Sequence, residues 1–206
     1  MKRGLFIAFE GIDGSGKSTQ AKRVASATAA MLTFEPGDTK LGAALRQLLL
    51  HDLDVDPTSR AEALLMAADR AQHVETLIEP ALASGKTVIT DRFSASTLAY
   101  QGFGRRLDQT TLRHVVDFAT GGLQPDLTII VDCELATARQ RSSGTKADRL
   151  EQLDPSFHAA VRQGFLDLAK QNATFVVIDG NATLDEVNRA VDAALLRQIG
   201  LEVPRQ

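Results

Sequence analysis

Residues 11–18 read Gly11-Ile12-Asp13-Gly14-Ser15-Gly16-Lys17-Ser18 and fit the phosphate-binding loop (P-loop) pattern G-x-x-x-x-G-K-[ST]. An apolar run over residues 5–9 precedes them, and an Ala-, Gln- and Lys-containing stretch from Thr19 to about Ala30 follows. The motif therefore lies between a predicted strand and a predicted helix, which is the context that it needs. Backbone N–H groups of such a loop and the helix N-terminus bind phosphate oxygens. The sequence thus predicts a site for a nucleotide.

The P-loop pattern also assigns individual roles. Lys17 is expected to contact the β- and γ-phosphates, and the Ser18 hydroxyl to bind Mg²⁺. ATP and Mg²⁺ are the predicted cofactors. The residues expected to contact ATP are Gly11, Asp13, Gly14, Ser15, Gly16, Lys17, Ser18 and Thr19.

The rest of the chain alternates apolar runs with helical patterns. Further strands are predicted over residues 31–34, 87–90, 127–132 and 174–178, and the long helix over 58–79 is expected to stop near Pro80. This alternation predicts an α/β fold of the P-loop NTPase type, a three-layer sandwich in which helices cover both faces of a five-stranded parallel sheet. We expect one domain over residues 1–206.

Composition narrows the class of protein. The net charge of −3 gives no reason to expect nucleic acid as a partner. No run approaches the roughly 18 apolar residues that a membrane-spanning helix needs. A single cysteine, Cys133, excludes an internal disulfide, and the N-terminus shows no signal peptide. The expectation is a cytoplasmic protein whose Cys133 is a buried small residue.

Asp91 and Arg92 directly follow the predicted strand 87–90. Ligands of open α/β sheets bind at the carboxyl ends of the strands, where the P-loop also begins. An Asp there can hold a Mg²⁺-bound water, and an Arg can bind two phosphates and neutralise transition-state charge. The alternative is a salt bridge at the strand end.

A second basic cluster suggests a lid over about residues 139–149. It contains Arg139, Arg141, Lys146 and Arg149 around a small, polar stretch over 142–148. Such a lid can close over ATP, exclude water and bring an Arg to the transferring phosphoryl group. The alternative for each of these residues is a solvated charged surface.

Several further segments resemble the thymidylate kinase family of P-loop nucleoside-monophosphate kinases. The resemblance covers nearly the whole chain. The segments are Phe9–Thr19, Glu35-Pro36-Gly37, Leu64–Arg70, Asp91–Gly102, Pro125–Thr128 and Asp148-Arg149-Leu150-Glu151. The segment from Asp91 to Gly102 is the most specific, because general P-loop proteins lack it.

The resemblance implies transfer of the ATP γ-phosphate to dTMP, giving dTDP and ADP, by a homodimer. The catalytic cations would be Lys17 and Arg92 with Arg141 and Arg149 of the lid, and the metal contacts Ser18 and Asp91. Arg70 would bind the thymine carbonyl, and Tyr100 would disfavour a 2′-hydroxyl. The residues implied for the acceptor are Asp13, Glu35, Pro36, Met66, Arg70, Arg92, Ser96, Thr97, Tyr100 and Gln101.

Three positions depart from the family pattern. Met66 stands where a Phe usually stacks on thymine, so base selectivity could be looser. The usual Arg-Glu-Pro-Gly-Gly-Thr reads Phe34-Glu35-Pro36-Gly37-Asp38-Thr39, and Arg46 is the candidate replacement for the missing Arg. Some members carry a catalytic Arg in the P-loop where this chain has Gly14, so the catalytic cation should come from the lid.

Two other functions stay open from the residues alone. One is a kinase for another deoxynucleotide or for a deoxynucleoside. The other is a non-catalytic ATP-binding module, which the lid cations and the second crevice argue against.

Overall fold

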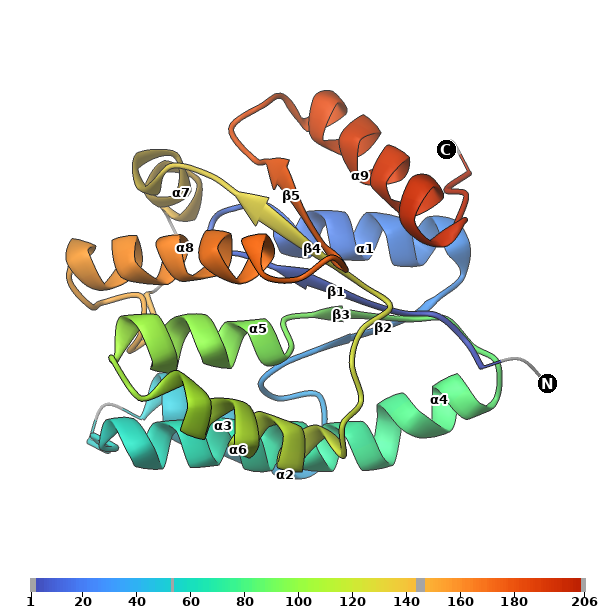
Figure 1. Ribbon diagram of the computed structural model, residues 1–206. Helices are drawn as coiled ribbons and strands as arrows, with labels where there is room; N and C mark the ends of the chain where they lie inside the picture. Colours follow the sequence, from blue (N-terminus) through green and yellow to red (C-terminus); the bar gives the residue numbers. More distant parts are fainter. Residues whose placement is uncertain (1–2, 53, 144–146, 205–206) are drawn as a thin grey trace.

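The computed structural model describes residues 3–52, 54–143 and 147–204. Its centre is a five-stranded sheet of order β2-β3-β1-β4-β5, in which every neighbouring pair is parallel (Figure 1). The strands are β1 (Phe6–Glu10), β2 (Met31–Phe34), β3 (Val88–Asp91), β4 (Leu127–Asp132) and β5 (Phe175–Asp179). Each lies within one residue of its predicted range, and the predicted fold class is confirmed.

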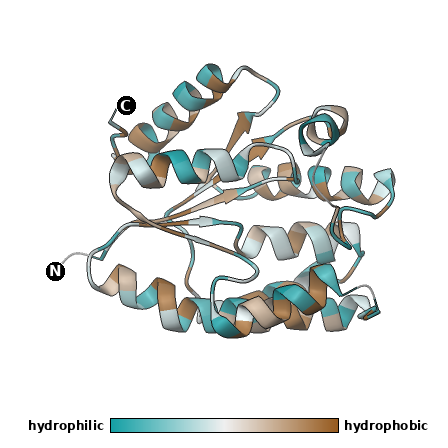
Figure 2. Cartoon of the chain, turned by 180° about the vertical axis from the view of Figure 1, so that it is seen from behind, coloured by the Kyte–Doolittle hydropathy of each residue, from teal (hydrophilic) through white to brown (hydrophobic). Residues whose placement is uncertain are grey.

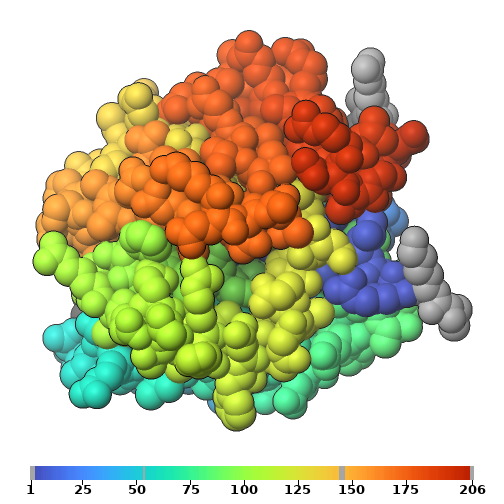
Figure 3. All heavy atoms as spheres, viewed as in Figure 1, coloured from blue at the N-terminus to red at the C-terminus, as the bar shows by residue number. Residues whose placement is uncertain are grey.

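Helices cover both faces of this sheet. One face packs on α1 (Lys17–Thr28) and α9 (Leu184–Ile199), with Ile7 and Phe9 of β1 against Val24 and Val191. The opposite face carries α3 (Ser59–His73), α4 (Glu79–Ala83), α5 (Ser94–Thr97), α6 (Gln109–Thr120) and α8 (Pro155–Lys170). Figure 2 shows the apolar strands between helices of mixed hydropathy. Figure 3 shows α8 lying across the middle of its face of the molecule. No helix in the described ranges is long and apolar enough to cross a membrane.

The long helix begins as predicted, but the prediction that it stops near Pro80 is wrong. The Thr58 side chain caps α3, and the helix then continues through a π-helical turn, η2 (Val74–Ile78), into α4. Pro80 lies in the first turn of α4. The wider turn before it relieves the clash that a proline ring makes with the preceding carbonyls.

Two more π-helical segments lie on the same side of the molecule. The short α2 (Lys40–Arg46) runs into η1 (Gln47–His51), and α5 runs into η3 (Leu98–Gly104). π-Helical turns are frequent at functional sites. The remaining helix, α7 (Leu135–Ser142), follows β4 and leads into the predicted lid, of which residues 144–146, including Lys146, lie outside the described residues.

Candidate active site

The P-loop connects the carboxyl end of β1 to α1. Gly14 and Gly16 adopt positive φ angles of 79° and 97°, and Gly16 is the N-cap of α1. A Cβ at Gly14 would also lie 2.2 Å from the Ala138 carbonyl oxygen of α7. Lys17 is buried at the start of α1, whereas Thr19 is exposed. The conformation at the tip of the loop is therefore one that glycine adopts readily and other residues rarely do.

Asp13 joins this loop to the Asp91-Arg92 turn. Its Oδ1 lies 3.1 Å from Lys17 Nζ and 2.6 Å from Arg92 Nη2, and the Tyr100 hydroxyl donates to its Oδ2. Burial opposes ionisation of Asp13, but Arg92 and Lys17 outweigh it and hold its pKa well below the usual range. The two cations expected to face the two substrates thus meet on one carboxylate.

Arg92 is held in a strained conformation. Its φ is 74°, which is uncommon for a side chain with a Cβ. Besides Asp13, its guanidinium donates to the Gly11 carbonyl, the Ser96 hydroxyl and the Tyr100 hydroxyl, and it lies 5.0 Å from the Tyr100 ring centre. The surrounding contacts fix the strained backbone, as is typical of functional sites.

Glu10 supports this turn, a role that the sequence analysis missed. It is fully buried at the end of β1 and accepts from the Phe93 N–H (2.9 Å), the Ser96 N–H (3.0 Å) and the Ser96 hydroxyl (2.6 Å). Burial raises its pKa to about 7 against the lowering effects of Ser96 and Arg92. The signal in the sequence was the position of this acidic residue at the end of an otherwise apolar strand.

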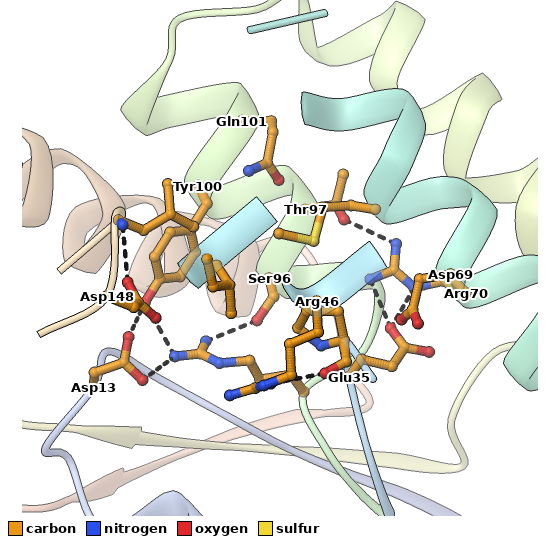
Figure 4. Close-up of a pocket in the computed structure, with 15 residues that line it drawn as sticks. Asp13, Glu35, Arg46, Asp69, Arg70, Ser96, Thr97, Tyr100, Gln101 and Asp148 are labelled. Carbon is orange, nitrogen blue, oxygen red and sulfur yellow. Dashed lines mark hydrogen bonds and ion pairs between the residues drawn. The ribbon is translucent and has the colours of Figure 1, made fainter. Parts of the chain in front are cut away.

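A solvent-open pocket lies beside the P-loop, between Asp13 at one end and Arg70 at the other (Figure 4). All ten residues that the family resemblance implied for the acceptor line it: Asp13, Glu35, Pro36, Met66, Arg70, Arg92, Ser96, Thr97, Tyr100 and Gln101. Arg46 lines it too, and its Nη1 donates to the Pro36 carbonyl at 2.7 Å. Four lining residues had no predicted role, namely Leu50, Asp69, Asp148 and Leu150.

The two ends of the pocket differ in their contacts. Figure 4 shows Asp13 and Tyr100 at one end and Arg70 with Asp69 at the other. Arg70 is 3% exposed; its Nε and Nη2 lie 2.8 Å from Glu35 Oε2, and its Nη1 donates to Thr97 Oγ1 at 2.8 Å. These contacts orient the Arg70 guanidinium before any ligand binds. Burial, followed by the charge of Glu35, raises the pKa of the adjacent Asp69 to about 6.

Ser18 and Asp91 line one further pocket together with Lys17. Asp91 Oδ1 is buried and has no hydrogen-bond partner in the described part of the chain. An unpartnered carboxylate oxygen at this place fits a Mg²⁺-bound water, since Mg²⁺ keeps several waters and uses few protein ligands. Within the described ranges, no group of three or more His, Cys, Asp or Glu residues is arranged to hold a metal ion.

The two lid arginines implied in catalysis lie in different surroundings. Arg141 donates to the Gly180 carbonyl at 2.8 Å and approaches the Ser15 carbonyl of the P-loop at 3.5 Å. Arg149 is bound to other segments: its Nη2 lies 2.6 Å from Glu62 Oε2 and its Nε 2.7 Å from the Leu49 carbonyl oxygen. Glu62 is fully buried and is also paired with Arg105. Sequence reasoning missed this carboxylate, which fixes the base of the lid.

The thymidylate kinase family model matches residues 9–191. The chain belongs to the thymidylate kinase family. Among curated thymidylate kinases, that of Synechococcus sp. (strain CC9605) is 45% identical over 95% of this chain and 97% of its own length. That of Bifidobacterium longum subsp. infantis is 46% identical over 92% of this chain and 85% of its own. The crystal structure of thymidylate kinase from Ehrlichia chaffeensis superposes with a TM-score of 0.77 at 34% identity, covering 94% of this chain and 99% of that one.

Membership of the thymidylate kinase family makes this chain a nucleoside-monophosphate kinase, a phosphotransferase. Two departures from the family pattern have a structural explanation here. α7 lies against Gly14, so no side chain fits there without moving the helix. The Asp38 carboxylate, in place of a glycine, accepts a hydrogen bond from the Thr33 hydroxyl. Cys133 is buried, as predicted, and burial raises the pKa of its thiol.

Proposed function

We propose that the protein transfers the γ-phosphate of ATP to dTMP, giving dTDP and ADP. The observation that carries this proposal is the position of Asp13, whose carboxylate contacts both the P-loop cation Lys17 and the acceptor-pocket cation Arg92. Phosphoryl transfer between two nucleotides needs positive charge on both sides of the moving group. Lys17 would serve the ATP side and Arg92 the dTMP side.

The chemistry needs no strong general base. The second pKa of a phosphate monoester is about 6, so the acceptor is already anionic near neutral pH. A dTMP phosphate oxygen attacks the γ-phosphorus in line, and the bond to the bridging oxygen of ADP breaks. Lys17 and Arg92 exchange Asp13 for phosphate oxygens and neutralise the charge that develops. Ser18 and Asp91 would hold Mg²⁺, which neutralises the ATP phosphates when bound.

The acceptor pocket has contacts suited to a deoxynucleotide. Arg70 would bind the base edge, with Ser96, Thr97 and Gln101 nearby, and Met66 would lie against the ring through its polarizable thioether. Tyr100 is buried and its hydroxyl is hydrogen-bonded to Asp13 and Arg92. Its ring is therefore held in place and would exclude a 2′-hydroxyl. Glu35 and Pro36 would complete the loop around the acceptor.

We propose Arg141 as the lid cation that acts in catalysis, within a lid over about residues 139–149 of a single domain. Its contact with the P-loop backbone supports this choice. Arg149 could reach the phosphates only after leaving Glu62, so this geometry favours a positional role for it.

The test is ADP release in a coupled assay with ATP·Mg²⁺ and, in turn, dTMP, dUMP, dCMP, thymidine or no acceptor. Turnover should be strongest with dTMP. Equal turnover with dUMP or thymidine would favour a kinase for another deoxynucleotide or for a deoxynucleoside. ATP binding without acceptor-dependent turnover would favour a non-catalytic ATP-binding module.

We further propose a cytoplasmic homodimer. Phe118 of α6 is 90% exposed and Leu64 of α3 is 59% exposed, and these two helices pack side by side. Large apolar side chains so exposed favour a second copy of the chain as their cover. Light scattering should give twice the monomer mass for wild type and a lower mass for Phe118→Asp. A monomer mass for both proteins would contradict the proposal.

A further inference from the structure

A chain of hydrogen bonds runs beneath the base end of the acceptor pocket, and the mechanism above does not use it. His73 is 1% exposed; its Nδ1 lies 2.9 Å from Glu35 Oε1 and its Nε2 2.5 Å from Thr33 Oγ1. The Thr33 hydroxyl in turn donates to Asp38 Oδ2. Glu35 Oε2 accepts from Arg70, so the chain links Asp38 to the arginine expected to bind the base.

The donors and acceptors determine how many protons this series of hydrogen bonds needs. Asp38 and Glu35 are carboxylates that only accept when ionised, and Thr33 has a single proton to donate. Three hydrogen bonds join Asp38, Thr33, His73 and Glu35, but a neutral imidazole and one hydroxyl supply only two protons. A third proton is therefore required. Both ring nitrogens of His73 face an oxygen atom, so the ring can supply this proton by donating from each of them.

The charges around His73 favour the same placement. The charged groups that face it are Glu35, Asp38 through Thr33, Asp69 and Arg70. Glu35 is 5% exposed and lies between His73 and Arg70. With both nitrogens donating, the ring is charged, so its bond to Glu35 Oε1 is stronger than that from a neutral ring and leaves Oε2 for the guanidinium.

We propose that Asp38 is a positioning residue, which through Thr33 keeps both ring nitrogens of His73 as donors and so orients Glu35 and Arg70 for the acceptor base. Its kinetic consequence rests on the proposed function, whereas its effect on His73 does not. The usual glycine at this position would leave the Thr33 hydroxyl free to donate to His73 Nε2. A neutral His73, protonated on Nδ1 alone, would then complete the chain.

The direct test is the protonation of the His73 ring, read from imidazole ¹⁵N shifts of the full-length protein at pH 7. The chain has four histidines, and His73 is assigned by its missing signal in a His73→Gln sample. Wild type should show two protonated nitrogens, and Asp38→Ala only Nδ1. Asp38→Glu keeps a carboxylate acceptor for Thr33 and should retain the wild-type pattern, whereas the amide of Asp38→Asn can donate to Thr33 and should give the Asp38→Ala pattern. Asp56→Ala, which removes an exposed acid elsewhere, should change nothing.

The second test separates acceptor binding from chemistry. Asp38→Ala should raise KM for dTMP about two- to tenfold, the value of one hydrogen bond, and leave kcat and KM for ATP near wild type. Asp38→Glu, which keeps a carboxylate acceptor, should show little of that rise. The proposal is overturned if Asp38→Ala leaves the His73 nitrogens unchanged, or changes them without moving KM for dTMP. Absence of any dTMP-dependent turnover in wild type would instead reject the proposed function, while the ¹⁵N spectra would still decide the role of Asp38.

Discussion

The two cations around Asp13 and the two at the base of the lid are held in opposite ways. Lys17 and Arg92 are paired with Asp13, a carboxylate whose side chain is 36% exposed and that phosphate oxygens can replace. Arg149 and Arg105 are paired with Glu62, which no solvent reaches. A cation on an exposed acid is available for a ligand, whereas a cation on a buried acid holds segments together. The surroundings of a basic residue therefore indicate its function better than its place in a motif.

The largest expected effect comes from removing the buried carboxylate at the base of the lid. Glu62→Ala leaves two arginines without their shared carboxylate and should lower the free energy of unfolding by about 3–5 kcal/mol. Urea denaturation monitored by circular dichroism measures it. Asp13→Ala is the matched change beside the P-loop and should cost less, since the Asp13 side chain is 36% exposed and water can take its place. Equal losses in the two variants would contradict the distinction.

The second prediction concerns the acceptor side. Arg92→Ala should reduce kcat by about 10²–10³-fold, because a charge aimed at the transferring group is lost. Its melting temperature should stay close to that of wild type. Arg92→Lys should recover little, since an ammonium cannot reproduce the forked contacts of the guanidinium. Arg60→Ala removes an exposed arginine and is the control; near-wild-type turnover in Arg92→Ala would remove Arg92 from the mechanism.

A pH series tests the buried acid behind Arg92. The pKa of Glu10 is raised from 4.5 to about 7 in the folded protein, so burial favours its protonated form. The stabilisation this gives is complete below about pH 4.5 and is lost as pH rises through 7, a change of about 3 kcal/mol. Urea denaturation at several pH values between 5 and 8 should show wild type losing stability relative to Glu10→Gln. Parallel curves for the two proteins would show that Glu10 does not titrate in this range.

Gly14 tests the contact between the P-loop and α7. Gly14→Ala should cost about 1–3 kcal/mol of stability and lower kcat, because φ is positive and the Ala138 carbonyl leaves no room for a Cβ. Gly121→Ala is a useful control, since it has a similar positive φ of 58° but open space around the Cβ position. Thermal melts and ADP release measure the two effects. A Gly14→Ala protein no less stable than Gly121→Ala would contradict the crowding.

The smallest expected effect concerns the end of the pocket that is proposed to bind the acceptor base. Met66→Phe should increase the preference for dTMP over dUMP about two- to tenfold, because an aromatic ring stacks on thymine better than a thioether. The ratio of kcat/KM for the two acceptors measures it. Met66→Leu, which keeps the volume without the sulfur or the ring, should leave the ratio near wild type.

The parts of this protein that could be predicted from sequence are those that a contiguous stretch determines. The P-loop is fixed by its own glycines, and parallel strand topology brings Asp91 and Arg92 to the same edge. Glu62 and Arg149 are 87 residues apart, and nothing in either segment indicates that they meet. Asp69 and Asp148 line the pocket for the same long-range reason. Pro80 was misjudged because the π-helical turn that accommodates it has no local signature.

The shared carboxylate of Asp13 has a consequence for inhibitor design. An anionic fragment must displace Asp13 from Arg92 before it gains any contact, whereas a flat neutral ring at the other end meets an arginine that Glu35 and Thr97 already hold in place. Neutral heterocycles that bind from the Arg70 end should therefore gain more affinity per atom than phosphate mimics. Lead compounds are best grown from that end toward the P-loop, with the charged group added last.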